Sequence, residues 1–474
     1  MWTKYVVFVS ASVWAGCTSA SMATPTPSDD ASTDDDAVLE VASTVTDPGP
    51  RGGDRGAGGP FAGLSADEKT FFTEARDTFA EVDSVSGAIE EGKGLGPTFN
   101  GNSCAQCHAE PDVGGTSPHP TLGHIKVKNP QVDLATLDRV AGGNQQVPPF
   151  IKSDGPIREA RFISNPDGSP DGGVHGLYTI AGRTDAVGCV LAQPNFQKEV
   201  AASNVSFRIP TPVFGLGLLE AVDDDDLVAN LASNPSGKSG CGVSGTFNRS
   251  GNDGTITRFG WKAQNKSLLV FAGEAYNVEQ GVSNELFPNE RATAAGCQYN
   301  ASPEDATDTT TGGAPDTTLF AAFMRLSAAP VATTASPSEL RGQTLFGTAS
   351  APGIGCVFCH SDTLKTGGSR YGNMSAVEFH PYTDLAIHHM GSGLADQVTQ
   401  GNAGGDQFRT APLWGAGKRI FFLHDGRSGP SNGGLVNAIN AHGSRGSEAR
   451  GVLKKFVALS NTDQQAVIDF VRSL

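Results

Sequence analysis

The chain carries the pentapeptide Cys104-Ala105-Gln106-Cys107-His108 and, much later, a second one, Cys356-Val357-Phe358-Cys359-His360. In a C-x-x-C-H motif the two thiols add to the vinyl groups of a haem as thioethers, and the adjacent histidine ligates the iron. The alternative is an ordinary C-x-x-C thiol site that binds zinc or exchanges disulfides. Because the chain has only 8 cysteines and 10 histidines in 474 residues, two such matches by chance are not expected. The motifs therefore predict two covalently bound haem c groups, with His108 and His360 as proximal iron ligands.

Composition narrows the class of protein. The 34 basic and 50 acidic residues give a net charge of -16, which repels the phosphates of nucleic acids and excludes a nucleic-acid partner. The 60 glycines, 28 prolines and 38% hydrophobic residues favour long loops around modest cores. A chain of this length has room for two or three domains.

The N-terminus has the pattern of an export signal over residues 1–23. Lys4 is followed by an apolar stretch, Tyr5 to Val13, that is too short to span a bilayer. Cys17 follows Trp14-Ala15-Gly16, a sequence that resembles a lipobox, whereas Ser21-Met22-Ala23 offers an ordinary cleavage site. We therefore expect the protein in the periplasm or cell envelope, with contact to a membrane surface only through a lipid on Cys17.

Residues 24–60 are rich in Asp, Thr, Ser, Pro and Gly and predict a disordered linker. Ser65 and Glu68 form a capping-box pattern before an amphipathic helix that contains Phe71, Phe72, Ala75 and Phe79, and the first haem motif follows. The same order recurs at Ser336 to Glu339, before Leu340 to Phe346 and the second motif.

The last residues, Asn461 to Leu474, predict a closing helix whose apolar face is Val467, Ile468, Val471 and Leu474. A short helix, a haem motif and a closing helix are the parts of a small cytochrome c fold. The sequence thus predicts a mainly α fold with long loops and two cytochrome c-like haem domains. These are residues 61–330, with large insertions, and residues 331–474.

Six segments extend the pattern beyond the haem motifs. They are Gly94–Asn100, Gly215–Ala221, Arg258–Gln264, Tyr382–Leu385 with His388, Met390 and Gly391, Arg409–Gly415, and Leu423–Arg427. Together they resemble the bacterial di-haem oxidoreductases, a family described as peroxidases or thiol oxidoreductases. More distant resemblance is to the di-haem cytochrome c peroxidases and to the di-haem enzyme that matures methylamine dehydrogenase. The resemblance runs from about Gly59 to the C-terminus.

The resemblance implies roles for particular residues. Met390 stands where peroxidase relatives have the distal ligand of the C-terminal haem, and a thioether there raises the potential of the iron. His389, where the family pattern has aspartate, leaves His389 or His388 open as an alternative ligand. Arg427 suits a haem propionate, because a guanidinium binds carboxylates. Met390 as a core residue and Arg427 in a structural turn are the alternatives.

The N-terminal haem is by resemblance the reactive site, where a carboxylate or histidine has to move a proton between the oxygens of peroxide. Glu220 is the first candidate, followed by Glu159, His119, His124 and His175, although each is also explained as a surface group or helix cap. Trp261 and Trp414 are candidates for the tryptophan that peroxidase relatives place between their haems, or are core residues.

Three cysteines, Cys189, Cys241 and Cys297, lie outside the motifs. Two of them can pair in an oxidising compartment, and the sequence does not say which. Related peroxidases hold calcium between domains, but the sequence contains no EF-hand loop that would support a calcium ion here.

The function that follows is a redox enzyme, peroxidase-like, in which electrons from a small redox protein pass from the C-terminal haem to the N-terminal haem and reduce peroxide. One alternative is an electron-transfer cytochrome with both irons six-coordinate and no substrate. Another is an enzyme that oxidises a partner protein, with the electrons running the other way. A spectrum that detects a high-spin haem separates the first two.

Overall fold

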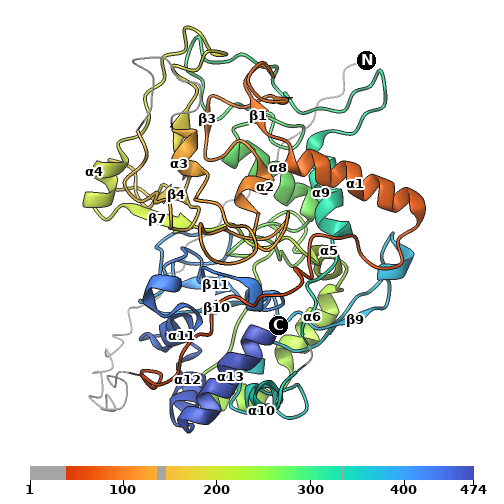
Figure 1. The fold of residues 1–474 in the computed structure, drawn as a ribbon, viewed down its shortest axis with the longest axis vertical. Helices are drawn as coiled ribbons and strands as arrows, with labels where there is room; N and C mark the ends of the chain where they lie inside the picture. Colours follow the sequence, from red (N-terminus) through yellow and green to blue (C-terminus); the bar gives the residue numbers. More distant parts are fainter. Residues whose placement is uncertain (1–38, 136–145, 334) are drawn as a thin grey trace, which may run out of the picture. The chain divides into compact units, whose positions relative to one another are not determined.

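The computed structural model describes residues 39–135, 146–333 and 335–474 (Figure 1). Its helices are α1 (Ala66–Ala80), α2 (Cys104–Cys107), α3 (Gln131–Leu134), α4 (Phe196–Ala201), α5 (Leu216–Glu220), α6 (Asp224–Ala232), α7 (Pro235–Cys241), α8 (Leu268–Glu279), α9 (Asp316–Leu326), α10 (Pro337–Phe346), α11 (Gly434–Asn440), α12 (Arg450–Val457) and α13 (Asn461–Ser473). Its strands are β1 (Asp83–Ser84), β2 (Gly92–Lys93), β3 (Thr98–Phe99), β4 (Glu159–Phe162), β5 (Val174–His175), β6 (Tyr178–Thr179), β7 (Val205–Arg208), β8 (Leu364–Lys365), β9 (Glu378–Phe379), β10 (Ile387–His389) and β11 (Gln407–Arg409).

The fold is mixed, with about 30% helix and 12% strand, whereas the sequence predicts a mainly α fold. The long loops are present, but the described strands are additional. The largest sheet has three strands in the order β5-β4-β7, and the other sheets are pairs. Each strand has two to four residues, which is too short for a legible alternation of apolar and polar residues.

Helix α1 begins at the predicted capping box. The Ser65 side chain accepts the Glu68 amide, and the Glu68 carboxylate accepts the Ser65 amide. The face that contains Phe72 and Phe79 is buried, and the ring of Phe79 lies 4.7 Å from that of Phe323 on α9. Phe79 also meets the ring of His108 edge-on at 5.9 Å, so the first haem motif is seated on the core formed by α1 and α9.

Helices α10 and α13 form the corresponding pair behind the second motif (Figure 1). The capping box of Ser336 and Glu339 is present, and the predicted apolar face of α13 is buried. Gly342 marks the crossing of the two helices, because a Cβ there would lie 1.9 Å from the carbonyl oxygen of Ala466. A side chain at this position would therefore separate the helices and loosen the core beside His360.

The prediction of a disordered linker over 24–60 is wrong for its described part. Val41 and Val45 are buried in the core of α11, α12 and α13. Asp47 forms a two-pronged ion pair with Arg472, with Nε to Oδ1 at 2.7 Å and Nη2 to Oδ2 at 2.6 Å. Composition failed here because a few apolar residues suffice when another part of the chain supplies most of the core. The predicted signal segment, Cys17 and residues 24–38 lie outside the described residues.

The described residues cluster as one compact unit, and the boundary at 330/331 stays a prediction. Cys189 and Cys297 are joined by a disulfide, which leaves Cys241 as a buried free thiol. Within the described ranges we found no helix that combines the length and apolarity needed to cross a bilayer.

Candidate haem sites

The first motif opens onto a cavity, which we call the N-terminal cavity. Its lining includes Cys104, Cys107 and His108. The carbonyl oxygen of Gly115 accepts a hydrogen bond from His108 Nδ1 at 3.1 Å. Burial lowers the pKa of His108 to about 4, so the ring is neutral and its Nε2 is the lone-pair nitrogen that a metal requires.

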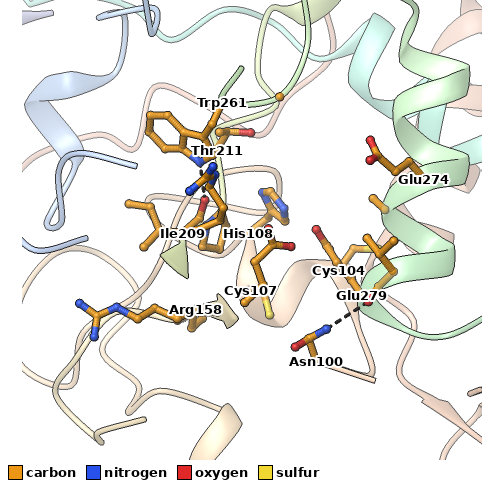
Figure 2. Close-up of a pocket in the computed structure, with 18 of the residues that line it drawn as sticks. Asn100, Cys104, Cys107, His108, Arg158, Ile209, Thr211, Trp261, Glu274 and Glu279 are labelled. Carbon is orange, nitrogen blue, oxygen red and sulfur yellow. Dashed lines mark hydrogen bonds between the residues drawn. The ribbon is translucent and has the colours of Figure 1, made fainter. Parts of the chain in front are cut away.

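Three carboxylates line the same cavity: Glu159 from β4, and Glu274 and Glu279 from α8. Figure 2 shows Glu274 and Glu279 on the α8 side of the cavity, apart from His108 and Cys107. Burial, and then the neighbouring charges of Glu159 and Glu274, raise the pKa of Glu279 to about 8. Glu279 is therefore protonated at neutral pH and can donate a proton, while Glu159 is held by Arg161 Nε at 2.9 Å.

The second motif opens onto a larger cavity, which we call the C-terminal cavity. Cys356, Cys359 and His360 lie on its wall, and most other lining residues are apolar. His360 Nδ1 donates to the carbonyl oxygen of Tyr382 at 3.0 Å. Burial lowers the pKa of His360 to about 4, with a further lowering by the charge of His442.

His442, after α11, is a further candidate iron ligand that the sequence does not reveal. It lines the C-terminal cavity, and its Nδ1 donates to the carbonyl oxygen of Ala438 at 2.8 Å. This is the arrangement of His108 and His360, and it leaves Nε2 free to bind a metal. No motif surrounds His442, and the only available signal was the presence of one more histidine after the H-D-G segment.

Met390 lines the C-terminal cavity as well, and its role as distal ligand stays a prediction. His424 also faces this cavity, where its ring stacks on that of Phe408 at 4.2 Å. Met390 and His424 therefore share the cavity with His360. Of the residues named, however, only His442 has its ring fixed in the manner of the two motif histidines.

The alternative ligand His389 is wrong. Its side chain is 52% exposed, it pairs with Asp406 at 2.9 Å, and it does not line the cavity. In β10 successive side chains point to opposite faces, so His388 faces inward instead. His388 contacts Asp384 at 3.0 Å and Glu448 at 2.9 Å, so both ring nitrogens are engaged and neither is free to ligate iron.

Glu220 does not line the N-terminal cavity. Its carboxylate binds Arg325 Nε at 2.6 Å and accepts the Leu268 amide at 2.8 Å, which ties α5 to α8 and α9. The first catalytic candidate is therefore replaced by carboxylates of β4 and α8, of which the sequence had suggested only Glu159. Three histidine candidates also lie elsewhere: His119 beside Phe421, His124 against Glu110, and His175 stacked on Phe162.

Arg427 does not reach either cavity. Its Nε donates to Asp425 at 2.5 Å and its Nη1 to the carbonyl oxygen of Gly393 at 2.7 Å. The propionate assignment is wrong, because Asp425 and Gly393 hold the guanidinium outside both cavities. Two other arginines, Arg409 and Arg419, line the C-terminal cavity instead.

Trp261 is the residue that the two cavities share. Its Nε1 donates to the carbonyl oxygen of Ile209 at 3.0 Å, which fixes the ring on the common wall. Trp414 is buried in the core against Phe379, with ring centroids 5.9 Å apart. The structure thus separates the two tryptophans: Trp261 lies between the cavities, and Trp414 is a core residue.

Both cavities suit a haem. Each has two thiols and a neutral imidazole on its wall. The C-terminal cavity also has a buried guanidinium with two nitrogens that lack a partner, Arg419 Nε and Nη2, as expected where a carboxylate is to bind. Calcium, which no sequence motif supports, is not tested by the structure: among the described residues, Cys359, Asp384 and His388 are the one group with three closely spaced metal-ligand atoms, and His388 and Asp384 already form an ion pair.

Two cavities, each with a C-x-x-C-H histidine on its wall, define the class of protein as one built to hold two haems. Residues 175–474 match the model of the family described as "Di-haem oxidoreductase, putative peroxidase". The chain belongs to this family, which makes the protein an oxidoreductase with haem as its cofactor. The matched range includes the second motif and begins after the first.

No curated protein matched the chain. Among solved structures, a hydrazine synthase from Kuenenia stuttgartiensis, pressurised with xenon, is 13% identical over 34% of this chain and 55% of its own, with a TM-score of 0.21. A MauG-like protein associated with microbial copper homeostasis is 17% identical over 55% of this chain and 89% of its own, with a TM-score of 0.27. The chain thus spans about half the length of the hydrazine synthase chain, and at these TM-scores neither likeness supports an argument.

Proposed function

We propose that the protein is an exported c-type cytochrome of the periplasm or cell envelope that reduces a small oxidant, peroxide being the first choice, at its N-terminal site. The haems would be attached through Cys104, Cys107, Cys356 and Cys359. When bound, they supply electron transfer from the C-terminal site to the N-terminal site and reduction of the oxidant there. A small redox protein is the proposed electron donor.

The proposal depends on one asymmetry between the cavities. The C-terminal cavity contains His442 and Met390 in addition to His360, so a sixth ligand is available. Among the described residues that line the N-terminal cavity, His108 is the only histidine, and methionine and tyrosine do not occur. An iron held there by His108 would have no second histidine, methionine or tyrosine among these lining residues, and so could bind an exogenous ligand, as a catalytic site requires.

The residues of the N-terminal cavity suit proton transfer to a bound oxidant. Glu279 carries its proton at neutral pH, so it can protonate a leaving oxygen as general acid. Glu159 and Glu274 face the same space and can return a proton to Glu279. Trp261, on the wall common to both cavities, is in place to carry electrons between the sites.

Cyanide binding tests the asymmetry. In the oxidised and half-reduced holoprotein we expect EPR and optical spectra of one low-spin haem, and one haem that is high-spin or becomes so and binds cyanide. If both haems stay low-spin and do not bind cyanide in any redox state, the proposal is contradicted. That result would favour an electron-transfer cytochrome without a substrate.

A matched pair of variants tests the proton donor. Glu279→Gln keeps the shape of the side chain but removes its proton, and we expect peroxide turnover to fall by about 10²-fold or more, with cyanide binding retained. Glu74→Gln changes an exposed carboxylate of α1 and should turn over like the wild type. Equal turnover in the two variants would exclude Glu279 as the acid.

A further inference from the structure

Arg409 and Arg419 form an unusual pair on the wall of the C-terminal cavity. Their exposed fractions are 7% and 6%, and no described carboxylate lies within ion-pair distance of either guanidinium. Arg409 Nε donates to the carbonyl oxygen of Gly260 at 3.0 Å. Arg419 Nε and Nη2 are buried and have no hydrogen-bond partner. Two buried cations without an anion are costly, since each has lost its hydration shell.

The neighbours of the pair add to this cost instead of relieving it. Burial lowers the pKa of each guanidinium to about 10, and the next cause is a further cation, Arg419 for Arg409 and Arg472 for Arg419. Arg472 is itself neutralised by Asp47. Both arginines line the C-terminal cavity and a small neighbouring cavity that Trp261 also lines.

We propose that Arg409 and Arg419 bind the propionates of the C-terminal haem, at the wall that this site shares with the N-terminal one. The inference rests on the proposed function only in requiring a haem at Cys356 and Cys359. A propionate supplies the missing anion, and the planar guanidinium of Arg419 can bind it with two parallel hydrogen bonds.

The proposal also assigns an orientation to the group. Trp261 accepts the Arg409 amide at its carbonyl oxygen at 2.9 Å, and Gly260 accepts the Arg409 side chain. Propionates held by the two arginines would therefore lie near the Gly260–Trp261 segment, of which Trp261 lines both cavities. Two fixed cations there would also stabilise the reduced iron and so raise its reduction potential.

The test compares Arg419→Gln with Arg427→Gln in the holoprotein. Both variants remove one positive charge, but Arg427 lies outside both cavities. In a spectroelectrochemical titration, the C-terminal haem of Arg419→Gln should have a reduction potential that is lower than that of wild type by about 59 mV. This shift corresponds to about a tenfold smaller ratio of reduced to oxidised haem at a given potential. The propionate bands of the resonance Raman spectrum should shift as well. Arg427→Gln should change neither readout.

Equal behaviour of the two variants would overturn the proposal. If Arg419→Gln does not mature, Arg419→Lys decides, because it keeps the charge and loses the planar fork: shifted propionate bands support the assignment, and unshifted bands refute it. An anion from the buffer as the true occupant would appear as a salt-dependent potential in the wild type. None of these readouts uses peroxide turnover, so an inactive but haem-loaded protein leaves the test intact.

Discussion

His442 and Met390 are both candidates for the distal iron ligand of the C-terminal haem, and single substitutions can distinguish them. We predict that His442→Ala converts the C-terminal haem to a high-spin form, because no other described imidazole in the cavity has its ring fixed with Nε2 free. Met390→Leu should leave the low-spin spectrum unchanged. His442→Met should keep the haem low-spin but raise its potential, since a thioether favours reduced iron. A high-spin signal in Met390→Leu alone would reverse the assignment.

The two tryptophans offer a second matched pair of residues. Trp261→Phe should slow electron exchange between the sites, because the ring lies on the wall that they share. Trp414→Phe, in the core against Phe379, should lower stability without altering the exchange. Rapid mixing of reduced protein with an oxidant measures the exchange rate. Equal rates in both variants would leave Trp261 a structural role only.

For single residues, the sequence could predict only those features that depend on neighbours along the chain. Cys104, Cys107 and His108 are neighbours in sequence, so their chemistry is legible from the spacing. The positions of Glu279, Arg419 and His442 on a cavity wall depend on contacts between distant parts of the chain. The residues next to them in the sequence form no motif that indicates a cavity. Glu220 and Arg427 were misjudged for the same reason: a motif shows that a residue is constrained, but not whether the constraint is an ion pair such as that with Arg325.

Among the secondary-structure contacts, the ion pair of Asp47 with Arg472 on α13 allows a specific prediction about stability. Burial raises the pKa of Asp47, but Arg472 and the amides of Leu435 and Gly49 outweigh it and lower the pKa below its ordinary value. Asp47→Ala should therefore lower the free energy of unfolding by about 2 kcal/mol or more, since it leaves Arg472 buried without an anion. Glu40→Gln, an exposed neighbour, is the control and should be within about 0.5 kcal/mol of wild type.

The pH dependence of this contact has a definite sign. A lowered pKa in the folded state means that the contribution of Asp47 is present above its unfolded pKa of about 3.9 and is lost as the pH falls through the folded value. The difference in unfolding free energy between wild type and Asp47→Ala should thus be full at pH 6 and shrink toward pH 3. A constant difference would mean that packing, and not the ion pair, is responsible.

Elements with strong end signals were the ones that the sequence could place. Helices α1 and α10 begin at their capping boxes, and α13 has the predicted buried face. The described part of the linker was missed because the contribution of Val41 and Val45 depends on a core formed by residues some four hundred positions later. The short strands were missed because two to four residues do not establish a period.

For the whole molecule, the excess of acidic groups predicts how stability changes with pH. Asp83 is buried and Asp316 is half-buried. Burial, and then the charges of Glu81, Asp316 and Glu304, raise the pKa of Asp83 to about 8. Burial, and then the charge of Asp305, raise the pKa of Asp316 to about 6. Carboxylates with raised pKa values contribute stability that is fully present below the unfolded pKa and is lost as the pH rises through the folded value. The free energy of unfolding should therefore fall between about pH 5 and pH 8, in addition to the general repulsion expected of a net charge of -16.

Asp83→Asn isolates this effect from that general repulsion. The amide stays neutral at every pH, so the variant should be more stable than wild type at pH 8 by roughly a few kcal/mol, and its advantage should be much smaller at pH 5. Asp77→Asn removes the same charge from the exposed side of α1 and should change stability little at either pH. Chemical unfolding at both pH values measures the difference. If the two variants gained stability equally, net charge would account for the loss at high pH, and the buried acidic group around Asp83 would not.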